Sequence, residues 1–541
     1  MTDRLPLETL AQILKYVPKL LPGEGHDMVD VRDLFPLTTI CRFWLDATLE
    51  LTSIWSTVSF NTRDDANPCF RLSRRAGESL RVHIITKHLI DETMFPFDLR
   101  RIRDLYIQTY RSGGAILSEV FRLQYTLALP ALERCTIFGG HIQGRVFPCS
   151  TQLRVLRFHH CHLVPHSGPL PALTHLHISE CIPINLQPSM AFLSGAPRLQ
   201  VFKLVLPRES VSPDSIRLHT GKGSVALSEL RVFETFFPLV NAQMMSATDF
   251  SERGELARRF PMELLACLAI PPSCAIRVGC LALSDLLPTL EQLCSRRKPT
   301  YVYVGQRWSS AENIRRGQVN ALNSFSFYAR DPDTSLDVSI KVTAAGPSEV
   351  RQPVQDEVQS RLADTLISFP TIRRLWMETP WFRGPTFFVL PQLHDLEFLC
   401  LFGNPQHSQP LADMLNSLSV LPTGEVPCPK LATFAVDCHD GASSHGLEAT
   451  SMPSVLALAR SRAAAGYPLR SLLLCLQERR DEQLVRVLHE YDGNGTLVRV
   501  DPRPGAHARV ECRWAEGLGK SWAGPPREEF EIARVGLAGL N

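Results

Sequence analysis

Two consecutive segments of the chain repeat one apolar pattern at an interval of twenty residues. The pattern runs through Leu153-x-x-Leu156-x-Phe158-x-x-Cys161 and again through Leu173-x-x-Leu176-x-Ile178-x-x-Cys181. A unit this short holds one strand and a return segment, and it buries its apolar side only against a neighbouring copy. The pattern therefore predicts a stack of repeats, which also suits a chain of 541 residues because a single core rarely serves so long a chain.

Weaker copies of the pattern occur on both sides of these two. They begin at Ile102, Leu132, Leu199 and Leu230 and, after a long interval, at Ile372, Leu396, Leu431 and Leu469. A proline shortly before the strand recurs as a restart signal, at Pro130, Pro171, Pro197, Pro391, Pro429 and Pro468. The spacing matches the leucine-rich repeat frame, in which stacked strands form a mostly parallel sheet with helices outside it. We therefore predict an α/β fold, an irregular leucine-rich-repeat-like solenoid over residues 99–500.

Other segments predict the elements around this sheet. Helices are expected at Met262–Leu268, Val354–Leu366, Ser454–Ala464 and Asp481–Tyr491. Residues 236–370 fit the frame poorly, and two strand-like runs within them, Ser324–Tyr328 and Leu336–Val342, indicate an antiparallel excursion. Residues 61–98 are predicted to be a linker into the array, and residues 501–541 a turn-rich tail with a poorly ordered end.

The first sixty residues carry a different, helical pattern. Apolar residues recur there at steps of three and four, first at Leu7, Leu10, Leu14 and Val17, and then at Leu34, Leu37, Cys41, Trp44, Leu45 and Leu51. This spacing predicts short amphipathic helices, and Pro6 suits the first turn of one of them. Helices this short cannot bury so much apolar surface between themselves. The surplus must dock on the rest of the chain or on a partner.

This N-terminal segment resembles an F-box. The matching motifs are Leu5-Pro6-Leu7-Glu8, Cys41-Arg42-Phe43-Trp44 and Ile54-Trp55, with aliphatic residues at helical spacing between them. The resemblance implies a three-helix F-box-like domain over residues 1–60 that docks on the adaptor of an SCF-type cullin–RING ubiquitin ligase. The adaptor-binding residues that it implies are Leu5, Pro6, Glu8, Leu10, Ile13, Leu14, Leu37, Cys41, Trp44 and Trp55. The segment Pro18–Asp30 is longer than the usual link between the first two helices, and we interpret it as a surface loop.

The combination of an N-terminal box and leucine-rich-type repeats resembles F-box substrate receptors, and the stretch Arg462–Leu469 is similar to fungal members. The resemblance implies that the box recruits the ligase and that the repeats select a client protein. Two alternatives stay open. The chain could be a ligase-independent repeat scaffold whose box is only an N-terminal helical cap, or an enzyme with an unrecognised site in residues 236–370.

Strand alternation indicates which side chains face away from the repeat core. Within each repeat the leucine positions point inward, and the positions between them point to the opposite face. The client-binding candidates on that face are Tyr106, Phe138, Arg157, His159, His175, His177, Lys203 and Trp376. Because neighbouring parallel strands lie about 4.8 Å apart, we expect Arg157 beside His177 and His159 beside Ser179.

The two best repeats are also rich in possible metal ligands, namely His159, His160, Cys161, His162, His166, His175, His177 and Cys181. Zinc needs about four ligands that converge tetrahedrally, whereas alternate residues of a strand point to opposite faces. Cys161 and Cys181 occupy repeat positions that turn into the core. We therefore predict no metal, and we expect surface histidines and buried thiols.

Composition and the remaining motifs narrow the function. The net charge of +2 without long like-charged blocks does not support nucleic-acid binding. No apolar run has the length of a membrane span, no signal peptide is recognisable, and fifteen scattered cysteines favour reduced thiols in the cytoplasm or nucleus. Phosphate-loop, nucleophile-elbow and His-Glu-x-x-His motifs are absent from the sequence, so we expect neither catalysis nor a cofactor.

Overall fold

The computed structural model describes residues 6, 8–10, 12–13, 39–50, 56–61, 74, 77, 79–86, 98–109, 129–139, 141–142, 151–163, 169–181, 186–206, 224–236, 263–281, 299–306, 323–331, 336–344, 360, 363–378, 389–402, 408–437, 452–476, 496–499 and 507–514. The chain divides into two compact units, Met1–Pro271 and Pro272–Asn541. We describe each unit separately.

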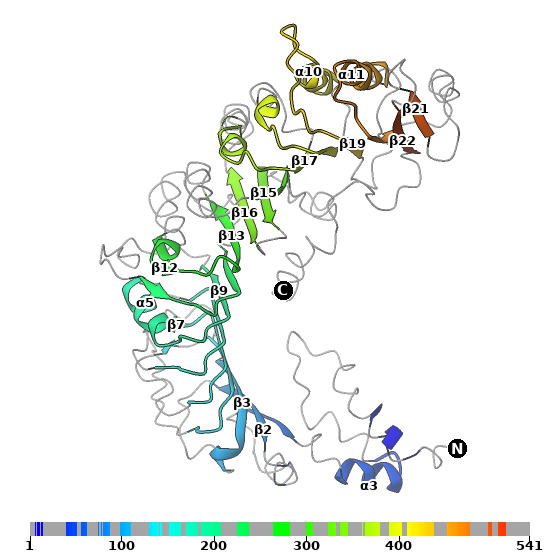
Figure 1. Cartoon of the computed structure of the whole chain (residues 1–541). Helices are drawn as coiled ribbons and strands as arrows, with labels where there is room; N and C mark the ends of the chain where they lie inside the picture. The colour runs from blue at the N-terminus through cyan, green and yellow to red at the C-terminus, as the bar shows by residue number, and fades with distance from the viewer. Residues whose placement is uncertain are drawn as a thin grey trace. The chain divides into compact units, whose positions relative to one another are not determined.

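The first unit contains a parallel sheet built from one strand per repeat (Figure 1). In spatial order its strands are β1 (Thr57–Asn61), β2 (Leu80–Thr86), β3 (Ile102–Thr109), β4 (Arg134–Phe138), β6 (Val155–His159), β8 (His175–Ser179), β9 (Val201–Val205) and β11 (Val232–Phe236). Each strand pairs in parallel with the next one in this order. The prediction of an α/β fold with a mostly parallel sheet is confirmed for this unit.

The leucine positions of the repeats form the core of the sheet. Leu153, Leu156 and Phe158 are buried, as are Leu173 and Leu176 in the next repeat. Burying a side chain of this size stabilises the fold by about 1.5–3 kcal/mol relative to leaving it in water. The stack of repeats therefore rests on a continuous apolar layer on one side of the strands.

The recurrent proline has a structural explanation in both units. The N–H of the first apolar residue of a repeat donates to the carbonyl three residues earlier in the pairs Leu132–Leu129, Leu173–Leu170, Leu199–Ala196, Ile372–Phe369 and Leu431–Cys428, at 2.9–3.2 Å. Each of these turns has proline at its second position, at Pro130, Pro171, Pro197, Pro370 and Pro429. Proline is favoured there because its fixed φ matches the turn and its missing N–H is not needed. In these five repeats the proline thus marks the turn from which the strand begins.

Short elements lie on the outer side of the first sheet in Figure 1. They are α5 (Leu186–Ser194), the parallel pair β5 (His141–Ile142) with β7 (His162–Leu163), and the parallel pair β10 (Val225–Ala226) with β12 (Leu268–Ala269). The 3-10 turn η5 (Leu99–Arg101) precedes β3, and the Asp98 carboxylate caps it by accepting from the Arg100 N–H at 2.9 Å.

The second unit has a mixed sheet. Its strands, in spatial order, are β13 (Ala275–Leu281), β16 (Leu336–Ala344), β15 (Asn323–Asp331), β14 (Tyr301–Gln306), β17 (Arg374–Glu378), β18 (Phe398–Phe402), β19 (Thr433–Asp437), β20 (Ser471–Leu476), β22 (His507–Trp514) and β21 (Thr496–Arg499). β15 is antiparallel to both β14 and β16, so the predicted antiparallel excursion is confirmed. From β17 to β20 the strands are again parallel.

Helices α10 (Ser408–Leu418) and α11 (Met452–Ala464) pack side by side in the second unit (Figure 1). The helix predicted at Ser454–Ala464 is confirmed as most of α11. The helix ends at Ala464, and Gly466 follows with a φ of 91°, which is easily adopted without a side chain; the Tyr467 N–H donates to the Arg462 carbonyl at 2.9 Å.

Arg462 is the first residue of the stretch Arg462–Leu469, and its contacts explain its place at the end of α11. Its guanidinium is fully buried and donates to the carbonyls of Leu418, Pro427 and Cys428 at 2.6–3.3 Å. Leu418 is the last residue of α10, so a buried cation meets the negative end of that helix. Arg462 therefore connects α11 to the end of α10 and to the turn before β19.

Several predicted boundaries need correction. β1 lies within the segment predicted as a purely helical domain, and β2 lies within the predicted linker, so the sheet begins at Thr57. β22 lies within the predicted turn-rich tail and pairs with β20. Polar and apolar residues alternate through His507–Trp514, which is the pattern of a strand. Leu268, predicted at the end of a helix, begins β12; residues 263–266 are helical.

The structure describes only part of the predicted N-terminal domain. Residues 8–10 and 12–13 are helical, and α3 (Arg42–Glu50) begins at the second residue of the Cys41-Arg42-Phe43-Trp44 motif. Residues 14–38 of the predicted three-helix domain, which include Pro18–Asp30, lie outside the described residues, as do the helix predicted at Asp481–Tyr491 and most of Val354–Leu366. Of the helices that the structure describes, none is both long enough and apolar enough to cross a bilayer.

Candidate functional site

The first sheet presents one face made of the residues between the leucine positions. We call it the polar face, and its described members are His83, Asp104, Tyr106, Gln108, Arg134, Thr136, Phe138, Val155, Arg157, His159, His175, His177, Ser179, Val201, Lys203, Val205, Val232 and Glu234. Strand pairing aligns these residues in rows that cross the sheet. The middle row runs His83, Tyr106, Thr136, Arg157, His177, Lys203 and Glu234.

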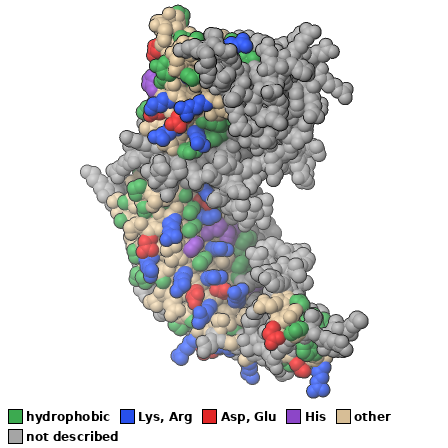
Figure 2. Space-filling model, turned by 45° about the vertical axis from the view of Figure 1, so that its right-hand side comes forward, with side chains coloured by type: hydrophobic (Ala, Val, Ile, Leu, Met, Phe, Trp, Pro, Cys, Tyr) green, Lys and Arg blue, Asp and Glu red, His purple; other side chains and the backbone are tan. Residues whose placement is uncertain are grey.

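The predicted neighbours across β6 and β8 are confirmed. Arg157 is aligned with His177, and His159 is aligned with Ser179. The rings of His159 and His177 meet edge to face with centroids 4.9 Å apart. In Figure 2 the histidines gather in one patch beside Lys and Arg side chains.

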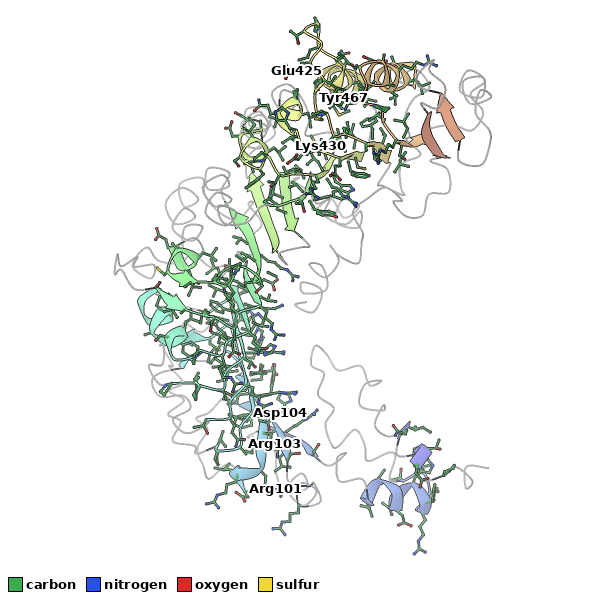
Figure 3. The ribbon with its side chains drawn as sticks, in the orientation of Figure 1. Arg101, Arg103, Asp104, Glu425, Lys430 and Tyr467 are labelled. Carbon is green, nitrogen blue, oxygen red and sulfur yellow. The ribbon has the colours of Figure 1, made fainter. Side chains whose placement is uncertain are left out.

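Charged residues border this patch on both sides. On one side, Asp104 of β3, which is labelled in Figure 3, pairs with Arg81 and Arg134 at nitrogen–oxygen distances of 3.2 and 3.8 Å. On the other side, Lys203 pairs with the buried carboxylate of Glu234 at 3.0 Å. Pairing of a carboxylate with a neighbouring strand's cation is the sheet counterpart of a helical ion pair, and it aligns the repeats across the face.

Aromatic contacts join the same rows. His83 meets Tyr106 edge to face with ring centroids 4.6 Å apart, and Phe138 contacts His159 and His160 at 6.1 and 5.2 Å. Burial raises the pKa of Tyr106 to about 12, so its hydroxyl stays protonated in ordinary buffers. The polar face therefore combines neutral aromatic groups with basic ones.

The histidines in the centre are uncharged near neutral pH. Burial, followed by the nearby His159, Lys203 and Arg157, lowers the pKa of His177 to about 3. Burial and then Arg157 also lower the pKa of His175. Arg157 and Lys203 therefore bring positive charge to the centre of the face, and they add to the effect of burial in disfavouring protonation of His177 between them.

The turns after the strands shape the edge of this face. Gly139, His160 and Glu180 have φ values of 75°, 51° and 51° and occupy the same position in successive repeats. The N–H of each donates to the carbonyl at the end of the next strand, at 2.7–2.8 Å. The Nδ1 atom of His160 also lies 3.3 Å from the Oε2 atom of Glu180 in the next repeat. A positive φ is strained for a residue other than glycine, and these contacts offset the conformational energy that it costs His160 and Glu180.

The cysteines predicted to turn inward do so. Cys161 and Cys181 are fully buried free thiols, and they donate to backbone carbonyls at 3.2–3.5 Å. Burial raises the pKa of Cys181, so this thiol stays protonated. Within the described residues, no three side chains of His, Cys, Asp and Glu gather as a metal site requires. The two thiols act as parts of the repeat turn.

Seven of the eight client-binding candidates lie together on the polar face, and the eighth does not. Trp376 belongs to the second unit and is only 3% exposed, packed with Cys400 and Ala435. The prediction that Trp376 is an accessible contact is therefore wrong, because its neighbours on adjacent strands bury it. Ser179, expected beside His159 on the same face, is buried as well, and so is Glu234 of β11.

Sequence reasoning missed part of the face. His83 and Arg81 come from β2, a strand that was predicted as linker, although the alternation of Leu80, Val82 and Ile84 indicates it. His160 and Glu180 occupy turn positions that the strand pattern does not address.

The candidate adaptor-binding residues differ in exposure. Ile13 is 39% exposed, the neighbouring segment exposes Ile40 by 52%, and Pro6 and Glu8 are exposed. Cys41 and Trp44 are half-buried, and Leu10 is fully buried. Leu5, Leu14, Leu37 and Trp55 lie outside the described residues.

Comparisons with known proteins add little. No protein-family model matches the chain. No curated protein matches it in sequence. A solved structure of InlP from Listeria monocytogenes is similar at 12% identity over 62% of this chain and 98% of that one, with a TM-score of 0.19. A score this low carries no argument, so the repeat assignment rests on the strand register and turns described above.

Proposed function

We propose that the chain is a repeat scaffold that binds a client protein on the polar face and acts as an F-box-type substrate receptor. In this function its N-terminal segment docks on the adaptor of an SCF-type ubiquitin ligase, inside the cell. The observation that carries the proposal is the polar face itself, on which basic, histidine and aromatic side chains are aligned across the strands. In the sequence, the repeats that form this face follow the segment with the F-box motifs.

The composition of the polar face supports client binding. Interfaces between proteins are enriched in aromatic residues and arginine at their centres and are fringed by polar groups. Tyr106, Phe138 and Arg157 lie in neighbouring repeats, and rigid strands hold them. A rigid surface loses little conformational entropy when a partner binds.

Exposed aliphatic residues support adaptor docking. Ile13 and Ile40 are 39% and 52% exposed, although both are large apolar side chains. Moving such a side chain out of water contributes about 1.5–3 kcal/mol when it is fully buried. The exposed apolar surface of these two side chains in the F-box-like segment is not buried by folding, so its burial against the adaptor would contribute free energy of binding.

A ligase-independent scaffold is the second candidate, and the full burial of Leu10 favours it. This residue belongs to the apolar stripe of the F-box motif, yet it is already covered. In this alternative the N-terminal segment only caps the sheet. We propose no catalytic activity and no cofactor for either function.

Capture of the recombinant SCF adaptor by the full chain distinguishes the two. We expect binding by the wild type and a loss of at least tenfold in affinity for the double variant Ile13→Asp with Ile40→Asp, because both changes place a charge in the docking surface. Ile367→Asp is the matched control, since Ile367 is similarly exposed, at 41%, in the second unit. Absence of wild-type capture would refute the ligase function and leave the scaffold.

A further inference from the structure

We propose that the strip formed by Arg157, His175, His177 and Lys203 binds an acidic, carboxylate-rich segment of the client protein. The inference rests on the proposed client-binding function and specifies the chemistry of the partner. It depends on three features of the polar face: the alignment of the strip, the distribution of charge around it, and an unpaired polar atom within it.

The alignment places two cations around one histidine. Arg157, His177 and Lys203 occupy the same row on the successive strands β6, β8 and β9. Strands of a sheet are about 4.8 Å apart, so the two cations stand roughly 10 Å apart with His177 between them. Side chains on one side of an extended peptide recur about every 6.7 Å, so a peptide laid across these strands can bring more than one carboxylate to the strip.

The charge around the strip is positive and unevenly compensated. Four cations lie on or beside the described part of the polar face: Arg81, Arg134, Arg157 and Lys203. Asp104 compensates Arg81 and Arg134, and Glu234 compensates Lys203. Among the described residues, no carboxylate lies within ion-pair distance of Arg157, which is exposed. An incoming carboxylate therefore finds an accessible guanidinium, and Arg binds carboxylates with two parallel hydrogen bonds.

His177 supplies a further reason for an anion at this place. Its Nε2 atom is buried and has no hydrogen-bond partner among the described residues. The groups that face it are His159 and Arg157 on β6, His175 on its own strand and Lys203 on β9, of which the last is paired with Glu234. Burial, followed by His159, Lys203 and Arg157, disfavours a positive charge on this ring, and a carboxylate above the row would offset the part that comes from these neighbours.

The acidic residues on the face argue for a peptide and against a nucleic acid. Asp104 and Glu234 flank the strip on its two sides, three strands and two strands from His177, respectively. A polyphosphate backbone with evenly spaced charges would meet both of them, whereas a peptide can place its carboxylates between them. The net charge of +2 for the whole chain points in the same direction.

The test measures binding of a fluorescent Glu-rich decapeptide to the full chain by anisotropy, with an equally long Lys-rich peptide and a Gln-rich peptide for comparison. We expect binding of the acidic peptide alone, weakened at least fivefold by Arg157→Gln and further by Arg157→Gln with Lys203→Gln. The matched control is Arg198→Gln, an exposed arginine before β9 that pairs with Glu229 outside the strip. It removes the same charge and should leave the affinity within twofold.

Other outcomes would overturn the inference. These are no binding of the acidic peptide by the wild type, equal binding of the Gln-rich peptide, or equal weakening by Arg157→Gln and Arg198→Gln. Preference for a singly phosphorylated neutral peptide over the Glu-rich one would also overturn it, since it would assign the strip to phosphate. Because Arg157 is exposed, we expect the variant to keep the wild-type unfolding midpoint. The adaptor is absent from this assay, so its result is independent of adaptor capture.

Discussion

The two units use one repeat frame but present opposite chemistry on the same side of their strands. In the first unit the middle row contains Arg157, His177 and Lys203. In the second unit the aligned row contains Tyr303, Trp376, Cys400, Ala435 and Leu473. The frame thus determines where the strands lie, whereas the residues between the leucines determine whether a face is a polar surface or part of an apolar layer.

Aromatic stacking accounts for the apolar row of the second unit. Trp376 stacks on Tyr301 with centroids 6.2 Å apart and contacts Phe398 at 5.1 Å. In the neighbouring row, which aligns Tyr301, Arg374 and Phe398, the Arg374 guanidinium lies over the Tyr301 ring at 5.1 Å, so even a charged residue covers an aromatic one. Lys430, by contrast, lies outside this cluster and pairs with Asp395 at 2.6 Å (Figure 3).

Substitutions at equivalent strand positions give the largest expected difference between the units. Trp376→Ala should lower the free energy of unfolding by about 3–5 kcal/mol, because it leaves a cavity between aromatic neighbours. Arg157→Ala, at the middle position of β6, should change it by less than about 0.5 kcal/mol because that side chain is exposed. Denaturant unfolding of both variants measures the contrast. Similar losses for the two variants would mean that the faces do not differ as described.

A smaller effect is expected from the buried arginine of the second unit. Arg462→Ala leaves the carbonyls of Leu418, Pro427 and Cys428 without their donor, and it should lower the free energy of unfolding by about 3 kcal/mol. Arg460→Ala on the exposed side of the same helix is the control and should cost under about 0.5 kcal/mol. Equal effects of the two substitutions in denaturant unfolding would show that the carbonyl contacts contribute nothing.

The smallest predicted effect concerns pH and the first unit. Unfolded His177 takes up a proton near its ordinary pKa of 6.5, whereas the folded residue does so only near pH 3. The unfolded state therefore binds more protons between these values, and the free energy of unfolding should fall by up to about 2 kcal/mol between pH 7 and pH 5. His177→Gln should remove this part of the pH dependence, and His394→Gln, an exposed histidine of the second unit, should retain it. Parallel pH profiles for wild type and His177→Gln would contradict the assignment.

Much of the sheet could be predicted from local spacing. The leucine positions and the prolines before them mark where strands such as β8 and β9 begin, because each repeat must bury its apolar side in the same way. The alignment of Arg157 with His177 followed from that frame. β22 was missed because the many glycines and prolines around it resemble a tail, and its pairing with β20 is a long-range contact.

The environment of individual side chains could not be predicted in the same way. Alternation correctly places Trp376 on the face opposite the leucines, but its burial depends on Phe398 and Tyr301, which reach it from neighbouring strands. The same holds for His177, whose low pKa depends on burial and then on His159, Lys203 and Arg157 of neighbouring strands. A single strand's pattern contains no information on such neighbours.

Bridging by the intact chain tests the central claim, that one molecule connects a client on the polar face to a ligase adaptor. Immobilised adaptor is incubated with a fluorescent Glu-rich peptide in the presence and absence of the full chain, and the retained fluorescence is measured. The account predicts retention only when the chain is present, and loss of retention with either Arg157→Gln or the Ile13→Asp, Ile40→Asp double variant. The account would be contradicted if the wild-type chain retained no more peptide fluorescence than the control without the chain, at protein concentrations that saturate each of the two interactions measured separately.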